Sequence, residues 1–586
     1  VALGGGSWYD TALVYEPLGQ RACKETRKAN VKRETGRVFS RWFLLMLLCT
    51  VGCGDAPKPE ATKPLEVTPV QGGVFRRAFA STGLSLDPRE VADSFSHEVC
   101  RQMYDGLVEF DQEARVSPVI AESWQVSADR LTYTFKLRRD VKFHQVCGEN
   151  DASTLNAGRV CTAEDVDYTF HRLLDPAMKS QRGQEFLVIR GATDYATGKA
   201  SRIDGIKVLA SDSLSMTLEK PFSPFLQLLA LSNAFIVPAD EARRDNPKLG
   251  ALPVGSGPFR YAGWKGETLI LKANPDYFRG RPYLDTLEFP IIRDEKERFA
   301  AFKRGELLIN DVPDPEYKNV KTDPSWAPHF QETSRWGTYY IGFNVGKPPF
   351  DNPKVRQAIN YAIDRETIVN LILNGRARVA KGVLPPGILG YNPNLKGYSY
   401  DLPRAKKLLA EAGYPDGKGF PEISLQYNRD PAHVRSSEFI LANLRDLGIT
   451  CTLKEVEFTE HLRSVENGDV GFFRMGWTVD YPDPDNFLFT LFHSSNFGAK
   501  GNFTRYANPR LDELLEKARF ELDARDRIPI YHQAEQMVVD DAPWVFVYHY
   551  TTHVIAQPQV RGLRITPLGL PFVLYRQLWL APAKGG

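Results

Sequence analysis

The segment 474–487 brings together residue types that could hold a cation in a dry pocket. Its sequence is Arg-Met-Gly-Trp-Thr-Val-Asp-Tyr-Pro-Asp-Pro-Asp-Asn-Phe, and it follows an apolar stretch typical of a strand. Asp480 supplies a carboxylate and Trp477 an indole, and this combination can hold an ammonium group by charge pairing and cation–π attraction. The alternative is purely structural, because Asp and Pro are also common residues of a turn after a strand.

Side-chain alternation sorts the residues of this segment if it is extended. Successive side chains of a strand point to opposite faces, so alternate residues after Arg474 share its face. These residues are Gly476, Thr478 and Asp480. Trp477 then points to the other face, away from the carboxylate. A bend at Gly476 would bring the indole and the carboxylate to the same side.

Motifs for the common catalytic chemistries are weak or missing in the sequence. His549 and His553 have i, i+4 spacing, but the surrounding Tyr, Val and Thr favour a strand, and the Glu of a zinc-protease helix is missing. The serine in 254–258 lacks the first Gly of a nucleophile elbow, and no G-x-x-x-x-G-K-S/T loop occurs. Asp483 and Asp485 fit a solvated turn better than acid–base catalysis. We therefore expect no catalytic residues, no metal site and no cofactor.

Length and composition place the chain among ordinary soluble globular proteins. It has 586 residues, of which 42% are hydrophobic and 25% charged. This length is enough for more than one domain. The formal net charge is only +2, without the basic excess of a nucleic-acid binder, so we expect no nucleic-acid partner.

The N-terminal segment 1–53 differs from the rest and predicts export. Basic residues precede the weakly polar run 42–52, which is too short to span a bilayer and has the length of a signal-peptide core. The run ends in Thr-Val-Gly-Cys, which resembles a bacterial lipobox with Thr50 where Leu is usual, so Cys53 would be lipidated. The Pro-rich, charged stretch 54–71 predicts an extended tether. The folded body would then be anchored to a membrane surface outside the cytoplasm.

Two cysteines flank a polar loop at 148–160. In an exported protein, a disulfide between Cys147 and Cys161 is the favoured interpretation. By restricting the unfolded chain, it would add roughly 3 kcal/mol to the free energy of unfolding. A pair of metal ligands is the alternative, which is weaker because no His or second Cys pair is near. Cys100 and Cys451 are expected to be small buried hydrophobic residues.

Strand and helix patterns alternate along the body of the chain, which favours layered α/β structure. Alternating or apolar runs predict the strands, and N-cap, Pro and Gly signals bound the helices. The predicted strands are 73–79, 106–110, 131–138, 338–344 and 449–456, and the predicted helices are 94–104, one opening at 162, one at 352, one at 401 and one ending near 448.

Short motifs spread over about residues 72–580 carry a family resemblance through their order and spacing. Through the order of these motifs, the chain resembles the substrate-binding proteins of ABC importers, in the oligopeptide- and dipeptide-binding family. The motifs are Leu86-Asp87-Pro88, Tyr104-Asp105-Gly106-Leu107, Ala121-Glu122-Ser123-Trp124, Val141-Lys142-Phe143-His144, Gly255-Ser256-Gly257-Pro258-Phe259, Asn274-Pro275-Asp276-Tyr277-Phe278, Val355-Arg356-Gln357-Ala358-Ile359, Ala362-Ile363-Asp364-Arg365 and the segment 476–487.

The resemblance implies an α/β fold of two lobes, that of class II periplasmic binding proteins, with an additional α/β subdomain. Two crossing strands, near 336–343 and 545–550, would join the lobes, which close around the ligand. The expected domains are lobe I at 72–97, 205–336 and 551–586, the extra subdomain at 98–204, and lobe II at 337–550.

The resemblance also implies roles for the segment after 474. In similar peptide-binding proteins an Asp at the position of Asp480 pairs with the peptide α-ammonium, and the indole matching Trp477 lines the cleft. An Arg at the position of Arg474 can face the peptide carboxylate. Backbone groups at Gly476 and Thr478 would bond the extended peptide as a neighbouring strand does.

The expected function is therefore that of a solute-binding lipoprotein, a monomer and not an enzyme. It would capture short peptides and deliver them to an ABC permease with its ATPase subunits. Because members of this family also bind nickel chelates, haem and sugars on the same frame, the fold does not fix the ligand. A peptide-sensing or chaperone-like lipoprotein without transport is the other alternative.

Overall fold

The structure of the protein is a computed structural model. The predicted signal segment, Cys53 and most of the tether lie outside the residues that it describes, as do the side chains of 146–148 and 151–155. The described residues are 68–80, 83–148, 151–155, 158–177, 180, 183–239 and 253–582.

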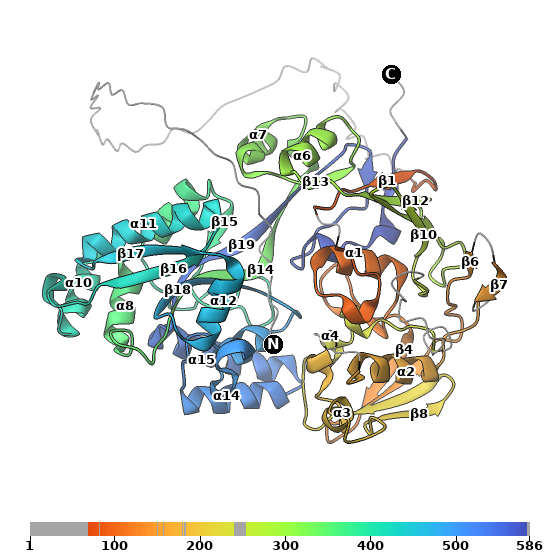
Figure 1. Cartoon of the computed structure of the whole chain (residues 1–586), viewed down its shortest axis with the longest axis horizontal. Coiled ribbons are helices and arrows are strands. Elements are labelled where there is room, and N and C mark those ends of the chain that lie inside the picture. Colours follow the sequence, from red (N-terminus) through yellow and green to blue (C-terminus); the bar gives the residue numbers. More distant parts are fainter. Residues whose placement is uncertain are drawn as a thin grey trace, which may run out of the picture. The chain divides into compact units, whose positions relative to one another are not determined.

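A sheet of seven strands organises the C-terminal part of the described chain (Figure 1). Its strand order is β13-β19-β14-β18-β16-β17, and β15 pairs with β19 beside that path. The strands are β13 (Ile309–Asp311), β14 (Phe330–Phe343), β15 (Ala377–Val379), β16 (Ile423–Asn428), β17 (Cys451–Val456), β18 (Phe472–Thr478) and β19 (Trp544–Ala556).

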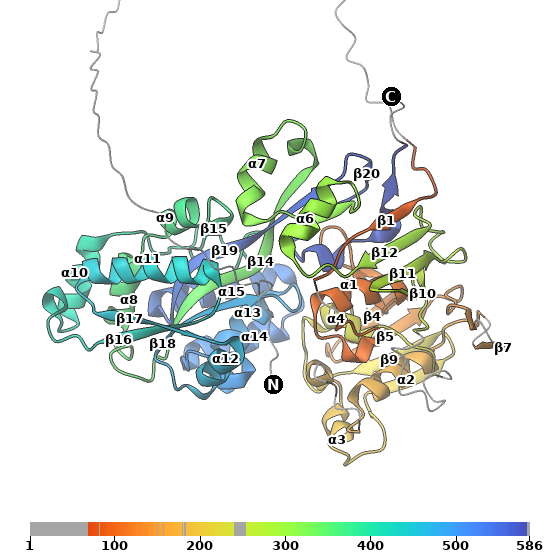
Figure 2. The same ribbon diagram turned by 45° about the horizontal axis from the view of Figure 1, so that its top comes forward.

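Two long antiparallel strands, β14 and β19, run side by side through this sheet (Figures 1 and 2). Their pairing shifts register between Ser334 and Thr338. On one side of the shift β19 also pairs with β13, and on the other β14 pairs with β18. The strands predicted at 336–343 and 545–550 are parts of this pair, which extends further than the sequence pattern indicated.

Helices cover both faces of the sheet. The face with Tyr340 and Trp544 packs against α13 (Pro484–Phe492), α14 (Pro509–Phe520) and α15 (Ala524–Asp541). The face with Tyr339 and Val545 packs against α8 (Pro353–Ala362), α10 (Leu402–Glu411) and α11 (Pro431–Leu447). Alternate residues of one strand therefore belong to two different cores, as the pleat requires.

A second sheet combines the start of the body with residues far along the chain. Its order is β1-β12-β11-β10, and it packs with α1 and with residues 554–578 in one buried cluster. The elements are β1 (Val74–Arg76), α1 (Ser94–Met103), β10 (Phe259–Lys265), β11 (Thr268–Ala273) and β12 (Thr286–Pro290).

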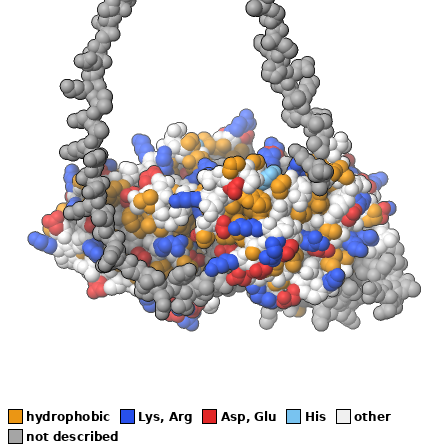
Figure 3. Space-filling model, turned by 90° about the horizontal axis from the view of Figure 1, so that it is seen from above, with side chains coloured by type: hydrophobic (Ala, Val, Ile, Leu, Met, Phe, Trp, Pro, Cys, Tyr) orange, Lys and Arg blue, Asp and Glu red, His pale blue; other side chains and the backbone are white. Residues whose placement is uncertain are grey.

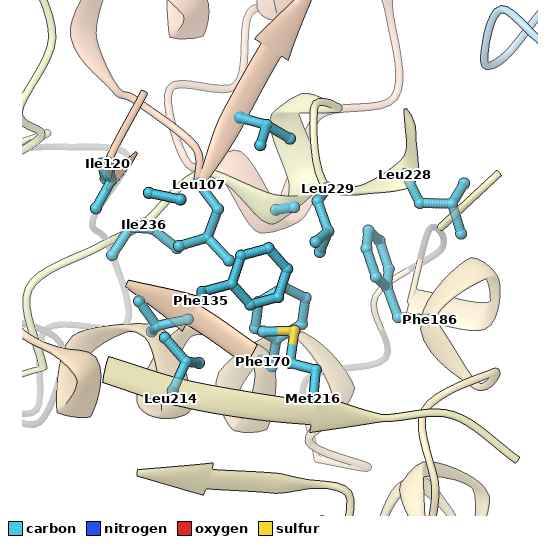
Figure 4. Packing of buried hydrophobic residues seen from close by; sticks show 14 of the residues in the cluster. Leu107, Ile120, Phe135, Phe170, Phe186, Leu214, Met216, Leu228, Leu229 and Ile236 are labelled. Carbon is cyan, nitrogen blue, oxygen red and sulfur yellow. The ribbon is translucent and has the colours of Figure 1, made fainter. Parts of the chain in front are cut away.

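A third sheet, of order β4-β5-β9-β8, has its own hydrophobic core, which Figure 4 shows. Leu107, Phe135, Phe170, Leu214 and Met216 meet there. We call the part of the chain built on this sheet the β4–β8 subdomain. Its strands β8 and β9 come after residue 204, where the expected extra subdomain ends, and α1 packs with the second sheet. The strands are β4 (Ala121–Val126), β5 (Thr132–Leu137), β8 (Ile206–Ala210) and β9 (Ser213–Thr217).

None of the helices in the described chain is long and apolar enough to cross a membrane. On the face drawn in Figure 3, acidic, basic and apolar side chains are interspersed.

Shorter elements complete the described chain. The remaining strands and helices are β2 (Val108–Phe110), β3 (Val116–Pro118), β6 (Val146–Gly148), β7 (Asp151–Leu155), β20 (Val560–Arg561), β21 (Trp579–Leu580), α2 (Ala163–Leu174), α3 (Ala192–Ala196), α4 (Phe225–Leu228), α6 (Glu295–Lys303), α7 (Tyr317–Thr322), α9 (Arg365–Thr367) and α12 (Phe458–Asn467).

Most local signals in the sequence correspond to real helix ends. The side chain of Asn352 caps α8 with Pro353 at its first position, and Asp401 caps α10. Gly448 ends α11 with φ +91°. The predicted strand 73–79 is shorter, since β1 has only three residues.

Helix α13 was not predicted. The run Tyr-Pro-Asp-Pro-Asp indicates a turn, but Asp483 is an N-cap and Pro484 the first residue of a helix. The polar loop predicted after 147 likewise contains the short β6–β7 hairpin.

Candidate ligand-binding site

The segment that carries Asp480 begins on β18, between β14 and β16. The pairing of β18 with β14 runs over the whole strand without a register shift, so the bend considered at Gly476 does not occur. Trp477 is 7% exposed and packs in the core under α13–α15. The indole therefore lies on the opposite face from Arg474.

The guanidinium of Arg474 is buried on the face that carries Tyr339. Its Cζ atom lies 4.5 Å from the centroid of the Tyr339 ring. Nη1 donates to Oδ1 of Asn428 at 3.0 Å, and Nη2 to the hydroxyl of Tyr550 at 3.4 Å. Among the described residues Nε has no hydrogen-bond partner, and no carboxylate forms an ion pair with this guanidinium. The nearby Asp430 carboxylate acts on Arg474 only through its charge, without direct contact. A buried cation that no carboxylate contacts directly favours an anionic group from outside the chain.

Two buried histidines near Arg474 add no charge at neutral pH. Burial lowers the pKa of His461 to about 4. Burial, with the nearby Arg474 charge, lowers the pKa of His433 to about 2. Both rings are therefore neutral, and Nε2 of His461 donates to the carbonyl oxygen of Arg474 at 2.7 Å.

Within the described chain, no strand pairs with the β16 side of β18 beyond its first two residues, and we call this stretch the open edge of β18. β16 pairs with β18 only at those two residues, and the carbonyl of Arg474 points to the same side, where His461 reaches it. In an antiparallel pair, the N–H and C=O groups of alternate residues point to the same edge. The backbone groups of Gly476 and Thr478 therefore face away from β14, where an added strand could pair with them.

Asp480 is half-buried just beyond the end of β18, and Asn486 holds it. The backbone N–H of Asp480 donates to Oδ1 of Asn486 at 3.0 Å, and Nδ2 of Asn486 donates to Oδ2 of Asp480 at 3.3 Å. The indole N–H of Trp477 donates to the same Oδ1 at 2.9 Å. The carboxylate and the indole are thus coupled through one amide instead of by direct contact.

The turn after Asp480 rests on a buried charge network, which corrects the expectation of a solvated turn. Asp483 and Asp485 are fully buried. Arg527 forms a bidentate pair with Asp483, at 2.6 and 3.0 Å. Asp485 accepts from the Tyr481 hydroxyl at 2.7 Å and lies 3.3 Å from Nε of Arg519.

Both this turn and the end of α14 contact the β4–β8 subdomain, since Tyr481 belongs to the hydrophobic cluster of that subdomain and Arg519 lies beside it. The N–H of Ser223 donates to the carbonyl of Arg519 at 3.0 Å. The Arg519 guanidinium lies 4.7 Å from the Phe222 ring centroid. At the edge of this contact Arg130 pairs with Glu521 at 2.9 Å.

Two histidines and two cysteines are the remaining residues that the sequence pointed to. His549 and His553 are buried on β19 and hydrogen-bonded to Thr338 and Thr551, as the strand pattern indicated. The side chain of Cys161 is buried, whereas that of its expected partner at 147 lies outside the described residues. The disulfide therefore stays a prediction.

Several residues around the segment were not found from the sequence. Asn428 offered one usable signal, because it ends a strand parallel to β18, and polar residues gather where such strands end. Tyr339, Tyr550 and His461 offered none, because they come from distant elements. Asn486 lies in the segment itself, but its role was missed because this part was expected to be a turn.

Comparison with known proteins places this chain in a family. The family model for bacterial extracellular solute-binding proteins, family 5 (middle), matches residues 115–499. Heme-binding protein A of Haemophilus influenzae is 32% identical over 525 residues, which cover 87% of this chain and 93% of that protein. Probable di/tripeptide-binding protein 5 of Pseudomonas aeruginosa is 32% identical over 478 residues, which cover 79% of this chain and 87% of that protein.

A solved structure gives the same result. The ABC transporter-associated periplasmic binding protein DppA from Helicobacter pylori, in complex with the peptide STSA, is similar with a TM-score of 0.69 and 29% identity. The match covers 87% of this chain and 98% of that chain. The fold is thus the two-lobed α/β fold of solute-binding proteins. The chain belongs to family 5 of the bacterial extracellular solute-binding proteins, which are binding proteins and not enzymes.

Proposed function

We propose that this protein captures short peptides between its two lobes and delivers them to an ABC permease. The peptide lies extended along the open edge of β18. Its α-ammonium pairs with Asp480, its main chain bonds the backbone of Gly476 and Thr478, and its carboxylate faces Arg474. Main-chain bonds would give affinity without selecting side chains, as in other cases of strand addition.

One observation carries this proposal: an open strand edge lies between a half-buried carboxylate and a buried guanidinium that has no ion pair in the described chain. An extended peptide carries a cation, a row of amide groups and an anion, which match the carboxylate, the strand edge and the guanidinium in turn. Relatives named as dipeptide- and di/tripeptide-binding proteins support the same ligand class.

The ammonium contact is tested with paired peptides. We expect Asp480→Ala to lose about 2–5 kcal/mol of affinity for a free tripeptide, the cost of removing one partner of a buried charge pair. The N-acetylated tripeptide should bind the unmodified protein weakly and lose little further in the variant. Calorimetry with both peptides measures this, and an unchanged affinity for the free peptide would reject the role of Asp480.

Haem is the second candidate ligand, because a relative that covers most of the chain is named as a heme-binding protein. Haem has no ammonium group, so Asp480→Ala should not weaken its binding. Titration with hemin, followed by its absorption band, separates the two candidates. Native mass spectrometry of protein purified from cells then identifies the ligand that it carries.

Anchoring by lipid at Cys53 also belongs to this proposal. It rests on the signal-like run, which precedes the described residues, and on the tether, most of which precedes them as well. Cys53→Ser should release the protein from the membrane fraction, and globomycin, which blocks lipoprotein processing, should cause the precursor to accumulate. A membrane-bound Cys53→Ser protein would contradict lipid anchoring at this residue.

A further inference from the structure

Asn486 has a role that the sequence analysis did not assign, although it lies in the segment 476–487. It is 2% exposed in the first turn of α13. Its one side chain makes three hydrogen bonds: Oδ1 accepts from the Trp477 indole and from the Asp480 backbone, and Nδ2 donates to the Asp480 carboxylate. Both the main chain and the side chain of Asp480 are therefore fixed by the same amide.

Only an amide of this length satisfies all three contacts in the observed geometry. Two N–H donors converge on Oδ1, which fixes the orientation of the amide, because the flipped form would set an NH₂ group against both donors. A carboxylate at 486 could accept the same two bonds but would place a like charge beside Asp480. An alanine would leave the two N–H groups without their acceptor.

The support beneath Asn486 is rigid. Asp483 caps α13 and is clamped by Arg527, so the helix that carries Asn486 is anchored one turn away by a buried bidentate pair. A residue fixed in this way can orient its partner without cost at the moment of binding.

We propose that Asn486 is a positioning residue for the ammonium subsite. It holds the Asp480 carboxylate beside the open edge of β18 and prevents it from turning toward solvent, without itself touching the ligand. This inference rests on the proposed function, since it assigns Asn486 a role only through Asp480.

The test is the ratio of affinities for a free tripeptide and for its N-acetylated form, measured by calorimetry. In Asn486→Ala we expect this ratio to fall about tenfold, the effect of losing one hydrogen bond to a charged group, while binding of the acetylated peptide changes little. In Asp480→Ala the additional Asn486→Ala change should have almost no further effect, because both act on one contact. Asn486→Ser, which keeps a shorter hydroxyl donor and acceptor, should give an intermediate ratio and serves if the alanine variant does not fold.

Asn496→Ala is the matched control. Asn496 donates to the carbonyl of Phe489 beyond the far end of α13, so its loss can alter stability but should leave the ratio unchanged. Equal weakening of both peptides by Asn486→Ala, or an additive effect with Asp480→Ala, would overturn the positioning role. An unmodified protein that binds both peptides equally would instead reject Asp480 as the anchor, whatever the Asn486 variants do.

Discussion

At the scale of single residues, Arg474 is the clearest sign of an anionic ligand group. We expect Arg474→Met, which keeps the apolar stem, to weaken binding of a free tripeptide by about tenfold or more and to leave a C-terminally amidated tripeptide almost unaffected. The reason is that a hydrogen-bonded ion pair in a buried site contributes more than a neutral contact. Calorimetry with the two peptides measures the effect, and Arg378→Met, an exposed change on β15, is the control. Equal losses for both peptides would exclude a carboxylate contact.

A second residue, Glu535, should make stability depend on pH. Its carboxylate accepts backbone N–H bonds from Val383 and Leu384, at 2.9 and 2.8 Å. Burial, which outweighs these bonds, raises the pKa of Glu535 to about 7. The folded state therefore binds a proton that the unfolded state releases at its ordinary pKa of 4.5, so the stability from this group is lost as pH rises through about 7.

Glu535→Gln should remove this dependence. At pH 8 the variant should be more stable than the unmodified protein by up to about 3 kcal/mol, and at pH 4 the two should be similar. Urea unfolding between pH 4 and 8 measures the difference. Glu411→Gln, which changes an exposed carboxylate, should change the free energy of unfolding equally at all pH values. If Glu535→Gln and the unmodified protein show the same pH dependence of stability, Glu535 is not the group responsible.

At the scale of elements, the buried pair beneath α13 should govern the stability of the site. Asp483→Ala removes both the N-cap of α13 and the counter-charge of Arg527, so we expect a loss of about 3–5 kcal/mol, mainly from a buried cation left alone. The double variant Asp483→Ala/Arg527→Met should recover part of that loss, because it removes the uncompensated charge. Urea unfolding measures both, and a double variant no more stable than the single one would refute this explanation.

The continuous strands β14 and β19 are the other decisive elements. Gly337 lies where their register shifts, and a Cβ there would come within 2.8 Å of the Trp477 carbonyl oxygen and of the Tyr550 ring. The backbone is thus packed tightly where the two strands pass beside the site, which is why a side chain is not accommodated at this position.

At the scale of the whole molecule, the contact of Arg519 with the β4–β8 subdomain should hold the closed state. Arg519→Lys keeps a positive charge near Asp485 but loses the planar group that lies over Phe222 and Phe489. We expect peptide dissociation to become several-fold faster while association changes little, as for most changes at an interface.

Stopped-flow tryptophan fluorescence measures both rates. Arg130→Lys is the control, since its pair with Glu521 is partly exposed and surface pairs contribute little. An unchanged dissociation rate in Arg519→Lys would show that this contact does not retain the ligand.

The sequence by itself determined those features that depend on neighbouring residues. Helix caps such as Asn352 and Asp401 were predictable because their signals lie within one turn, and strand alternation correctly set Trp477 opposite Arg474. The order of motifs indicated the family and its two-lobed fold.

Only the tertiary structure decided how the site is held. From the sequence, Asp483 and Asp485 look like residues of a solvated turn, because their buried partners lie far along the chain. Arg527, for example, comes 44 residues after Asp483. The link from Asn486 to Trp477 and Asp480 depends on a helix that starts within an apparent turn, and the boundary of the extra subdomain depends on which strands pair. Such features follow from packing and charge compensation between distant segments, which local sequence patterns do not encode.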